Sequence, residues 1–337
     1  MSLPKIMNIF TTTEVTKPER LDIFLSQALE KSRSFCQKII KEGCVFFHND
    51  PKNPIVSASH KVAVGDIYDV HMPELKEARL VAEDIPLAVV FEDEDIIVVN
   101  KPAGLVVHPA PGHHTGTLVH ALLHHCKDQL SGVNGEKKPG ILHRLDRFTS
   151  GLIVIAKHDQ AHHHLAEQIA TRTAKRIYIA FCQEELFPKA GVINKPIGRH
   201  HKHRLRMAVT QKGRESITNF HTICCAITPI LGRISLIQCS LETGRTHQIR
   251  VHLSHQRNSV LNDTLYGARA LQEQFPLFAE GQQALHAAEL HIIHPKTNEA
   301  LHFTAPASPA MRALYEHMLQ AQPDFKASKG LAKIFPS

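Results

Sequence analysis

Apolar positions in the first 72 residues follow two different periods. Within 19–29 they recur at helical spacing, at Leu21, Phe24, Leu25 and Ala28. A second helix is expected to begin after Ser32 or Ser34, because serine caps helix starts, and to end at Gly43. The segments 44–50 and 61–72 have the composition of strands. We therefore predict a small domain over 18–73, preceded by a loose tail at 1–17.

From residue 85 onward, short apolar runs alternate with turn residues. Helices are expected near 116–126, near 160–172 with Asp159 as the cap, and over 245–255. Strands are expected on both sides of the acidic turn at 92–95, and at 152–156, 176–181, 215–223, 233–241 and twice within 284–304. Because regular strand–helix–strand alternation is absent, we expect an α+β fold. This second domain is placed at 85–318, after a charged linker at 73–82 and before a C-terminal tail at 319–337, whose polar end at 321–337 is expected to fray.

The composition is that of an ordinary globular protein. Of 337 residues, 43% are hydrophobic and 21% are charged, which is enough for two or three domains. No apolar run reaches the roughly 18 residues of a membrane span, and the first residues lack the apolar core of a signal peptide. The seven cysteines form no CxxC pair, which favours reduced thiols and a cytoplasmic location.

Positive charge is concentrated in one segment. Residues 171–215 hold eleven Lys or Arg and three acidic residues, a net charge of +8, whereas the whole chain carries +7. Such a segment is typical of a protein that binds a polyanion. A solvated basic surface without a specific partner is the alternative.

The 26 histidines raise the question of a metal site. They are densest at 113–114, at His120 with His124, at 162–164 and at 200–203. No HExxH or other ligand spacing accompanies them, so we expect no metal. No GxGxxG follows a strand and no GxxxxGK[ST] is present, so no nucleotide cofactor is expected either.

The segment HRLDRFTSGL at 143–152 is the most informative one. It places Asp146 between Arg144 and Arg147, ahead of three turn residues and an apolar strand. A short charged loop that leads into a buried strand can hold a reactive side chain rigidly. A surface salt bridge of little energetic worth is the alternative.

Two further residues stand out by their surroundings. Arg245 would begin the 245–255 helix, where a cation faces the positive end of the helix dipole, so a nearby anion such as Asp146 would offset the cost. A side chain pointing into solvent is the alternative for Arg245. An Asp146 kept ionised by a guanidinium could act as a nucleophile or a base. Tyr178, one of four tyrosines, is either a core aromatic or a face on which an extruded base stacks.

Five ordered segments resemble the RluA-type pseudouridine synthases. They are HRLDRFTSGLIVIAK at 143–157, LAVVFEDEDIIVVNKPAGLVVHP at 87–109, KRIYIA at 175–180, KPIGRHHKHRLRMAV at 195–209 and LETGRTHQIRVHLSH at 241–255. Residues 19–72 resemble the αL RNA-binding module of a small-subunit ribosomal protein. The resemblance implies a mixed, largely antiparallel catalytic sheet with a small N-terminal RNA-binding domain.

The resemblance also implies an activity. Such enzymes isomerise uridine to pseudouridine within RNA, without cofactor or metal, and the branch with an αL module implies large-subunit ribosomal RNA or a precursor ribosomal particle as partner. Asp146 would be the essential carboxylate, which either attacks C1′ or removes the 2′ proton. Tyr178 would stack on the flipped uracil and Arg245 would pair with Asp146. Arg144 would help fill the gap left by the flipped nucleotide. The residues expected to contact RNA are Arg20, Arg33, Lys38, Lys41, Arg144, Arg147, Arg199, Lys202, Arg204 and Arg206.

Two departures and one alternative remain. Asn262 begins the segment NDTLYG, where the family has glycine, and this puts the local turn in doubt. The histidines at 200–203 replace a more usual His-Pro-Lys step, which could alter the grip on RNA or make it sensitive to pH. The alternative function is a catalytically idle RNA-binding ribosome-assembly factor. The presence of Asp146, Tyr178 and Arg245 argues against it, and a histidine-rich metalloenzyme ranks lower still.

Overall fold

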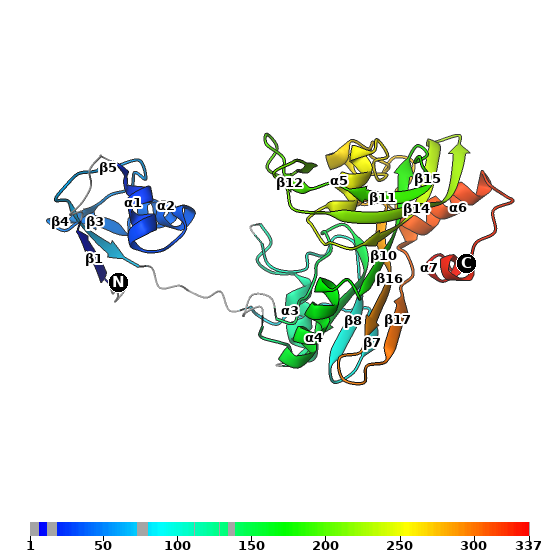
Figure 1. The fold of residues 1–337 in the computed structure, drawn as a ribbon, viewed down its shortest axis with the longest axis horizontal. Coiled ribbons are helices and arrows are strands. Elements are labelled where there is room, and N and C mark those ends of the chain that lie inside the picture. The colour runs from blue at the N-terminus through cyan, green and yellow to red at the C-terminus, as the bar shows by residue number, and fades with distance from the viewer. Residues whose placement is uncertain are drawn as a thin grey trace. The chain divides into compact units, whose positions relative to one another are not determined.

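The computed structural model describes residues 7–11, 19–72, 80–110, 112–127, 129–133 and 139–336 of the chain. These residues belong to two compact units that divide after residue 78, and each is described by itself (Figure 1). Most of the expected linker at 73–82 lies outside the described residues.

The first unit packs two helices against a small sheet. Leu21, Leu25, Ile39 and Ile40 are buried on the inner faces of α1 (Leu21–Ala28) and α2 (Arg33–Lys41). The sheet has the order β1-β6-β3-β4, and a second pair joins β2 to β5. Its strands are β1 (Met7–Thr11), β2 (Glu19–Arg20), β3 (Val45–Phe47), β4 (Asp50–Pro54), β5 (Lys61–Val62) and β6 (Ile67–His71). The expected loose tail at 1–17 is therefore wrong in part, because β1 pairs with β6 along its whole length.

The second unit is built on a nine-stranded sheet of order β11-β14-β15-β10-β16-β9-β8-β7, with β17 added beside β16 (Figure 1). Every pairing is antiparallel except that of β16 with β9, so the expected α+β fold with a mixed, largely antiparallel sheet is confirmed. A separate hairpin joins β12 (Ile197–Arg199) to β13 (Met207–Val209). The sheet strands are β7 (Val89–Glu92), β8 (Ile96–Lys101), β9 (Ser150–Ala156), β10 (Lys175–Gln183), β11 (Ala190–Asn194), β14 (Ile217–Thr228), β15 (Gly232–Leu241), β16 (Leu285–Ile293) and β17 (Ala300–Thr304).

Helices cover both faces of the β8–β9 pair. Alternate residues of these strands enter two separate cores, one shared with α3 (Leu118–Cys126) and one with α4 (Asp159–Ala170). The cap of α4 is His158, whose Nδ1 accepts the Ala161 N–H at 3.2 Å. Asp159, the expected cap, instead accepts the Ser131 hydroxyl at 2.7 Å. None of the helices in the described ranges is both long and apolar enough to cross a membrane.

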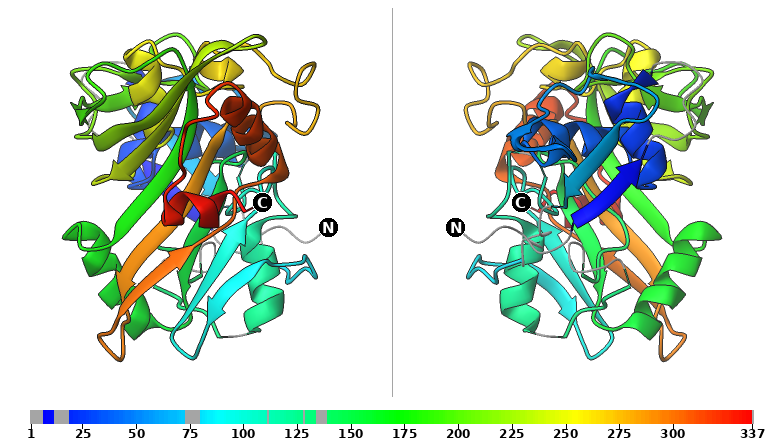
Figure 2. Two further views of the ribbon diagram at one scale, coloured as in Figure 1. Left: turned by 90° about the vertical axis from the view of Figure 1, so that its right-hand side faces the viewer. Right: turned by 90° about the vertical axis from the view of Figure 1, so that its left-hand side faces the viewer.

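The C-terminal region is packed, and the expectation of a frayed end at 321–337 is wrong. After α6 (Pro309–Gln320), the short helix α7 (Lys329–Ile334) buries Leu331 and Ile334 in the main core. Phe335 stacks on Tyr315 with ring centroids 4.3 Å apart. The left-hand view of Figure 2 shows α6 and α7, in red, in front of the strands. The polar composition concealed three apolar residues that anchor this segment.

A glycine allows the close pairing of β9 with β16. Gly151 of β9 lies opposite Ala287 of β16 in the parallel pair, with a φ of +116°. A Cβ at this position would lie 2.3 Å from the Ala287 carbonyl oxygen, so no larger residue fits. The close approach fixes the start of β9 and hence the loop that carries Asp146.

Candidate active site

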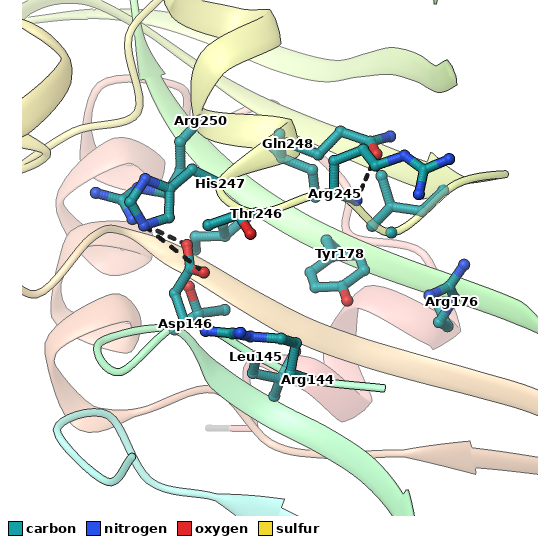
Figure 3. Close-up of a pocket in the computed structure, with 15 residues that line it drawn as sticks. Arg144, Leu145, Asp146, Arg176, Tyr178, Arg245, Thr246, His247, Gln248 and Arg250 are labelled. Atoms are coloured by element: carbon teal, nitrogen blue, oxygen red, sulfur yellow. Dashed lines mark hydrogen bonds and ion pairs between the residues drawn. The ribbon is translucent and has the colours of Figure 1, made fainter. Parts of the chain in front are cut away.

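One pocket of the second unit collects side chains from segments that are far apart in the sequence (Figure 3). Asp146 comes from the loop before β9, Tyr178 from β10 and Arg250 from α5 (Gln248–His255). Arg144 and Arg245 line the same pocket. The Asp146 side chain is 17% exposed, so its carboxylate is mostly covered but still accessible.

A lysine that the sequence did not single out holds the Asp146 loop. Lys101, the last residue of β8, is only 1% exposed. Its Nζ donates to the carbonyl oxygens of Pro102 and Leu105 at 2.9 Å, and to that of Arg147 at 3.1 Å. Burial lowers the pKa of Lys101 to about 7, against the attraction of the Asp146 charge. A lysine directly after an apolar strand and before a Pro-Ala-Gly turn was the signal that could have identified it.

Arg147 also helps to hold the Asp146 loop against the turn that follows β8. Its Nε donates to the Gly104 carbonyl oxygen at 3.1 Å, and its own carbonyl oxygen accepts the Gly104 N–H at 2.8 Å. Its guanidinium also lies 3.2 Å from His113 Nε2. Arg147 was expected to contact RNA, and it is exposed, but its side chain is already engaged with the neighbouring turn.

Arg250, and not Arg245, is the partner of Asp146. Its Nη1 donates to Asp146 Oδ2 at 2.9 Å, while Nε and Nη2 bind both oxygens of Asp263 at 2.6 and 2.9 Å. Burial lowers the pKa of Arg250, but the Asp263 hydrogen bonds and the Asp146 charge outweigh burial, so the net shift is upward. The guanidinium is therefore a permanent cation shared by two carboxylates.

The expected pairing of Arg245 with Asp146 is wrong because α5 begins three residues later than predicted. Arg245 lies in the loop before the helix, where its Nε donates to the Glu215 carbonyl oxygen at 3.0 Å. Its backbone N–H donates to Gln248 Oε1 at 2.9 Å, and its side chain points away from Asp146 (Figure 3). A cation near the start of the helix does meet a carboxylate, but this cation is Arg250, the third residue of α5.

His247 and Tyr266 connect Asp146 to the β12–β13 hairpin. His247 Nε2 lies 4.0 Å from Asp146 Oδ1, and His247 Nδ1 lies 2.7 Å from the Tyr266 hydroxyl. That hydroxyl accepts the Met207 N–H of β13 at 2.9 Å, so its own proton is free to bond Nδ1. Burial lowers the pKa of His247, which favours a neutral ring with its proton on Nε2, facing Asp146.

Tyr178 and Arg176 form the other side of the pocket (Figure 3). Tyr178 is 5% exposed, and burial raises the pKa of its phenol, which stays protonated at neutral pH. Arg176 is 6% exposed, and its buried Nε has no hydrogen-bond partner among the described residues. A buried cation in this state is suited to a carbonyl or phosphate oxygen from outside the protein.

Four of the expected RNA contacts of the second unit lie on the β12–β13 hairpin, whereas Arg144 and Arg147 lie on the loop of Asp146. Arg199, Lys202 and Arg204 are exposed, while Arg206 stacks its guanidinium 5.5 Å from the centre of the Tyr266 ring. Ile197 of the hairpin packs with Val251 of α5 and with Tyr266. The hairpin is therefore anchored to the helix that carries Arg250.

The expected RNA contacts of the first unit are arranged around a buried carboxylate. Asp22 is fully buried and accepts from Arg20 Nε at 3.0 Å and from Arg33 Nε at 2.9 Å. These hydrogen bonds, that of Arg20 first, hold the pKa of Asp22 far below its usual range. Both arginines remain about half exposed, and Lys38 and Lys41 are exposed on α2.

The turn at 262–267 survives the loss of glycine. Asn262 adopts a φ of +61°, which asparagine tolerates better than most residues. Its side chain donates to the Gln282 carbonyl oxygen at 2.6 Å and accepts the Leu271 N–H at 2.8 Å. The turn places Asp263 against Arg250 and Tyr266 against His247.

Known proteins resemble this chain in sequence. The family model described as RNA pseudouridylate synthase matches residues 95–255. A Bacillus subtilis protein named "Uncharacterized RNA pseudouridine synthase YlyB" is 41% identical over 309 residues, which cover 91% of this chain and 97% of that protein. A Zymomonas mobilis protein named "Ribosomal large subunit pseudouridine synthase D" is 40% identical over 314 residues, covering 92% and 96%. A Nitrosomonas europaea protein of the same name is 39% identical over 317 residues, covering 90% and 87%.

Two solved structures resemble it in fold. Human RNA pseudouridylate synthase domain containing 1 has a TM-score of 0.53 at 21% identity, and the match covers 74% of this chain and 99% of the human one. Human RNA pseudouridylate synthase domain containing 4 has a TM-score of 0.51 at 22% identity, covering 70% and 93%. At such low identity the likeness concerns the fold alone.

Proposed function

Because this chain belongs to the family of RNA pseudouridine synthases and isomerises uridine in RNA, we propose that its substrate is large-subunit ribosomal RNA, free or in a precursor particle. Two relatives at 39–40% identity carry the name ribosomal large subunit pseudouridine synthase D, which supports this substrate. The seven cysteines are all free thiols, which supports work in the reducing cytoplasm.

The proposed reaction centre is the Asp146 carboxylate. In the isomerisation the N1–C1′ bond breaks, the uracil turns, a C5–C1′ bond forms, C5 loses its proton and N1 gains one. Asp146 either attacks C1′ or removes the 2′ proton, and both roles need an accessible carboxylate near the sugar. The observation that carries the proposal is the carboxylate of Asp146, held by Arg250 in the pocket that Tyr178 lines.

The other residues that line the pocket are proposed to bind the RNA or to orient Asp146. Tyr178 offers its ring to the extruded uracil, and the exposed Arg144 fills the gap left in the RNA helix. Arg250 orients the Asp146 carboxylate in the role first expected of Arg245. Arg176 binds a uracil carbonyl or a phosphate oxygen, because its guanidinium lines the pocket together with Tyr178.

RNA is held outside the pocket by two basic surfaces. On the β12–β13 hairpin, Arg199, Lys202, Arg204 and Arg206 bind phosphates and offset the few kcal/mol that base extrusion costs. The first unit acts as an αL RNA-binding module, in which Asp22 orients Arg20 and Arg33 toward the RNA backbone. Lys38 and Lys41 extend that surface.

Tritium release tests the catalytic proposal. A large-subunit rRNA transcript labelled at uracil C5 is incubated with the protein, because isomerisation releases the C5 hydrogen to water. We expect release by the natural chain, with or without EDTA, and none by Asp146→Asn, which should still bind RNA. Release by that variant, or none by the natural chain on this transcript and on precursor particles, would reject the proposal.

Deletion of the first unit tests its separate role. A chain starting at residue 79 keeps the whole second unit. We expect it to bind rRNA more weakly at the same salt concentration, while its release of tritium at saturating RNA persists. Unchanged affinity and unchanged choice of uridines would contradict the αL assignment.

A further inference from the structure

Three potential ligand groups meet on the outer face of β16 and β17, apart from the pocket. His291 and His302 lie opposite each other in the antiparallel register of these strands, and Glu289 lies two residues from His291 on the same face. The alternate residues Leu290, Ile292 and Phe303 face the core. The two histidines are 38% and 54% exposed, and Glu289 is 18% exposed.

The donor atoms converge on one point. Glu289 Oε2 lies 3.1 Å from His291 Nε2 and 3.1 Å from His302 Nε2. The two imidazole rings have centroids 3.8 Å apart. Metal–ligand bonds of 2.0–2.1 Å around Zn²⁺ require ligand atoms about 3.3 Å apart in a tetrahedron and about 2.9 Å apart at right angles. Both oxygen–nitrogen separations of 3.1 Å lie between these values, so an ion can enter beside Glu289 Oε2 with small movements of the two imidazole side chains.

We propose that Glu289, His291 and His302 bind a divalent transition-metal ion, with Zn²⁺ as the probe. Two imidazole nitrogens and one carboxylate oxygen are a ligand set that Zn²⁺, Ni²⁺ and Cu²⁺ accept in proteins. The single negative charge of the set partly balances the ion. Water completes the coordination, because both histidines lie at the surface.

A second acidic and histidine-containing group is less suitable. Asp93, Asp95 and His294 also lie close enough to share an ion. However, Asp93 Oδ1 already accepts the N–H groups of Asp95 and Ile96, and Asp95 Oδ1 is bonded to His158 Nε2. The oxygens left to share an ion are unevenly placed, with Asp93 Oδ2 at 2.8 Å and Asp95 Oδ2 at 3.9 Å from His294 Nε2, whereas Glu289 Oε2 lies 3.1 Å from both imidazole nitrogens.

A nearby lysine could compete with a metal ion for the Glu289 carboxylate, so its position matters. Lys175 of β10 is in register with His291. Its Nζ donates to the Arg172 carbonyl oxygen at 3.1 Å, which engages the ammonium group away from the Glu289 carboxylate. An ion at this site would link β17 to β16 through side chains as well as through the backbone, and so act as a cross-strand clamp.

Zinc binding to the full chain tests the proposal. The protein, without a histidine tag and stripped with EDTA, is dialysed against Zn²⁺ at pH 7.5, and the double variant His291→Asn, His302→Asn is treated alike. The control is His200→Asn, His201→Asn, which removes a stacked histidine pair with centroids 4.8 Å apart and with no ion pair to a carboxylate among the described residues. We expect the natural chain and the control to hold one tight equivalent of Zn²⁺ that the His291/His302 variant loses.

Two further measurements make the result specific. Glu289→Gln should weaken Zn²⁺ binding while both imidazoles remain, and binding should fall at pH 5 because protons compete for the imidazole nitrogens. Tritium release by the His291/His302 variant should match that of the natural chain. Such a result would show that this variant folds and that the metal site is independent of the catalytic proposal. Equal Zn²⁺ stoichiometry and affinity in the natural chain and the double variant would overturn the inference.

Discussion

The Lys101 ammonium donates to the carbonyl oxygen of Arg147, the residue directly after Asp146, at a distance of 3.1 Å. The contact joins the end of β8 to the loop that precedes β9, two segments that are 46 residues apart. Since the same ammonium also serves two carbonyls of its own turn, it fixes the position of the Asp146 backbone without touching the carboxylate.

Replacing Lys101 with Met should therefore harm both stability and catalysis. The variant removes the donor of the Pro102 and Leu105 carbonyl oxygens and leaves the Arg147 carbonyl oxygen with the Gly104 N–H alone, which should lower the free energy of unfolding by roughly 1–3 kcal/mol. We expect kcat for tritium release to fall about tenfold, because the carboxylate loses its fixed position. Urea denaturation and single-turnover kinetics measure these effects. Lys296→Met, at a lysine that is 65% exposed, is the control and should change neither value.

Arg250 and Arg245 should respond differently to substitution. Arg250→Lys keeps a positive charge but loses the fork that binds Asp263 and reaches Asp146, so kcat should fall at least about tenfold. Arg245→Met should change KM more than kcat, because Arg245 lines the pocket without bonding the carboxylate. Steady-state kinetics of both variants compares them directly. A larger loss of kcat in Arg245→Met would contradict the pairing seen here.

Tyr266→Phe should uncouple the basic hairpin from the pocket. The variant keeps the ring under Arg206 and Arg250, but it removes the hydroxyl that accepts the Met207 N–H and bonds His247. We expect faster hydrogen exchange at the Met207 amide and a higher KM for RNA, with a smaller change in kcat. Exchange at Met207 equal to that of the natural chain would show that the hydroxyl does not hold the hairpin.

His286 should make stability depend on pH. Its Nε2 donates to the Ala305 carbonyl oxygen at 3.1 Å, so its Nδ1 accepts the Ser150 hydroxyl at 2.9 Å, and burial lowers the pKa of His286 to about 4. Between pH 6.5 and pH 4 the unfolded chain binds a proton at this histidine that the folded chain does not bind. The free energy of unfolding therefore decreases as the pH is lowered through that window. The full effect is about 3 kcal/mol. Urea denaturation measures the free energy of unfolding of the natural chain and of the His286→Gln variant. The difference between the two should become smaller from pH 7 to pH 4, and a difference that stays constant would contradict the prediction.

The sequence was sufficient for features that depend on short segments. The helix from Ser32 and the strand after Gly151 were predicted because caps, turns and alternation act over a few residues. Asp146 stood out because its neighbours in the chain are unusual. Its partner did not, since Arg250 is 104 residues away and the start of α5 had to be known within one turn.

Other features depended on contacts that no local pattern contains. Asn262 preserves the turn because its side chain finds Gln282 and Leu271, neither of which is adjacent in sequence. The C-terminal segment folds because Phe335 stacks on Tyr315, although the surrounding composition is polar. Lys101 does not stand out in the sequence for a related reason, because a lysine is usually at the surface and only the fold buries it.

The position of β16 has a consequence for the order of folding. Although β9 and β10 follow each other in the chain, β16 is inserted between them in the sheet. Asp146 lies just before β9, and Tyr178 is on β10, on the other side of the inserted strand. A growing polypeptide cannot complete the pocket until residue 293 has left the ribosome, so a chain stalled earlier has no working enzyme however well its first strands pair.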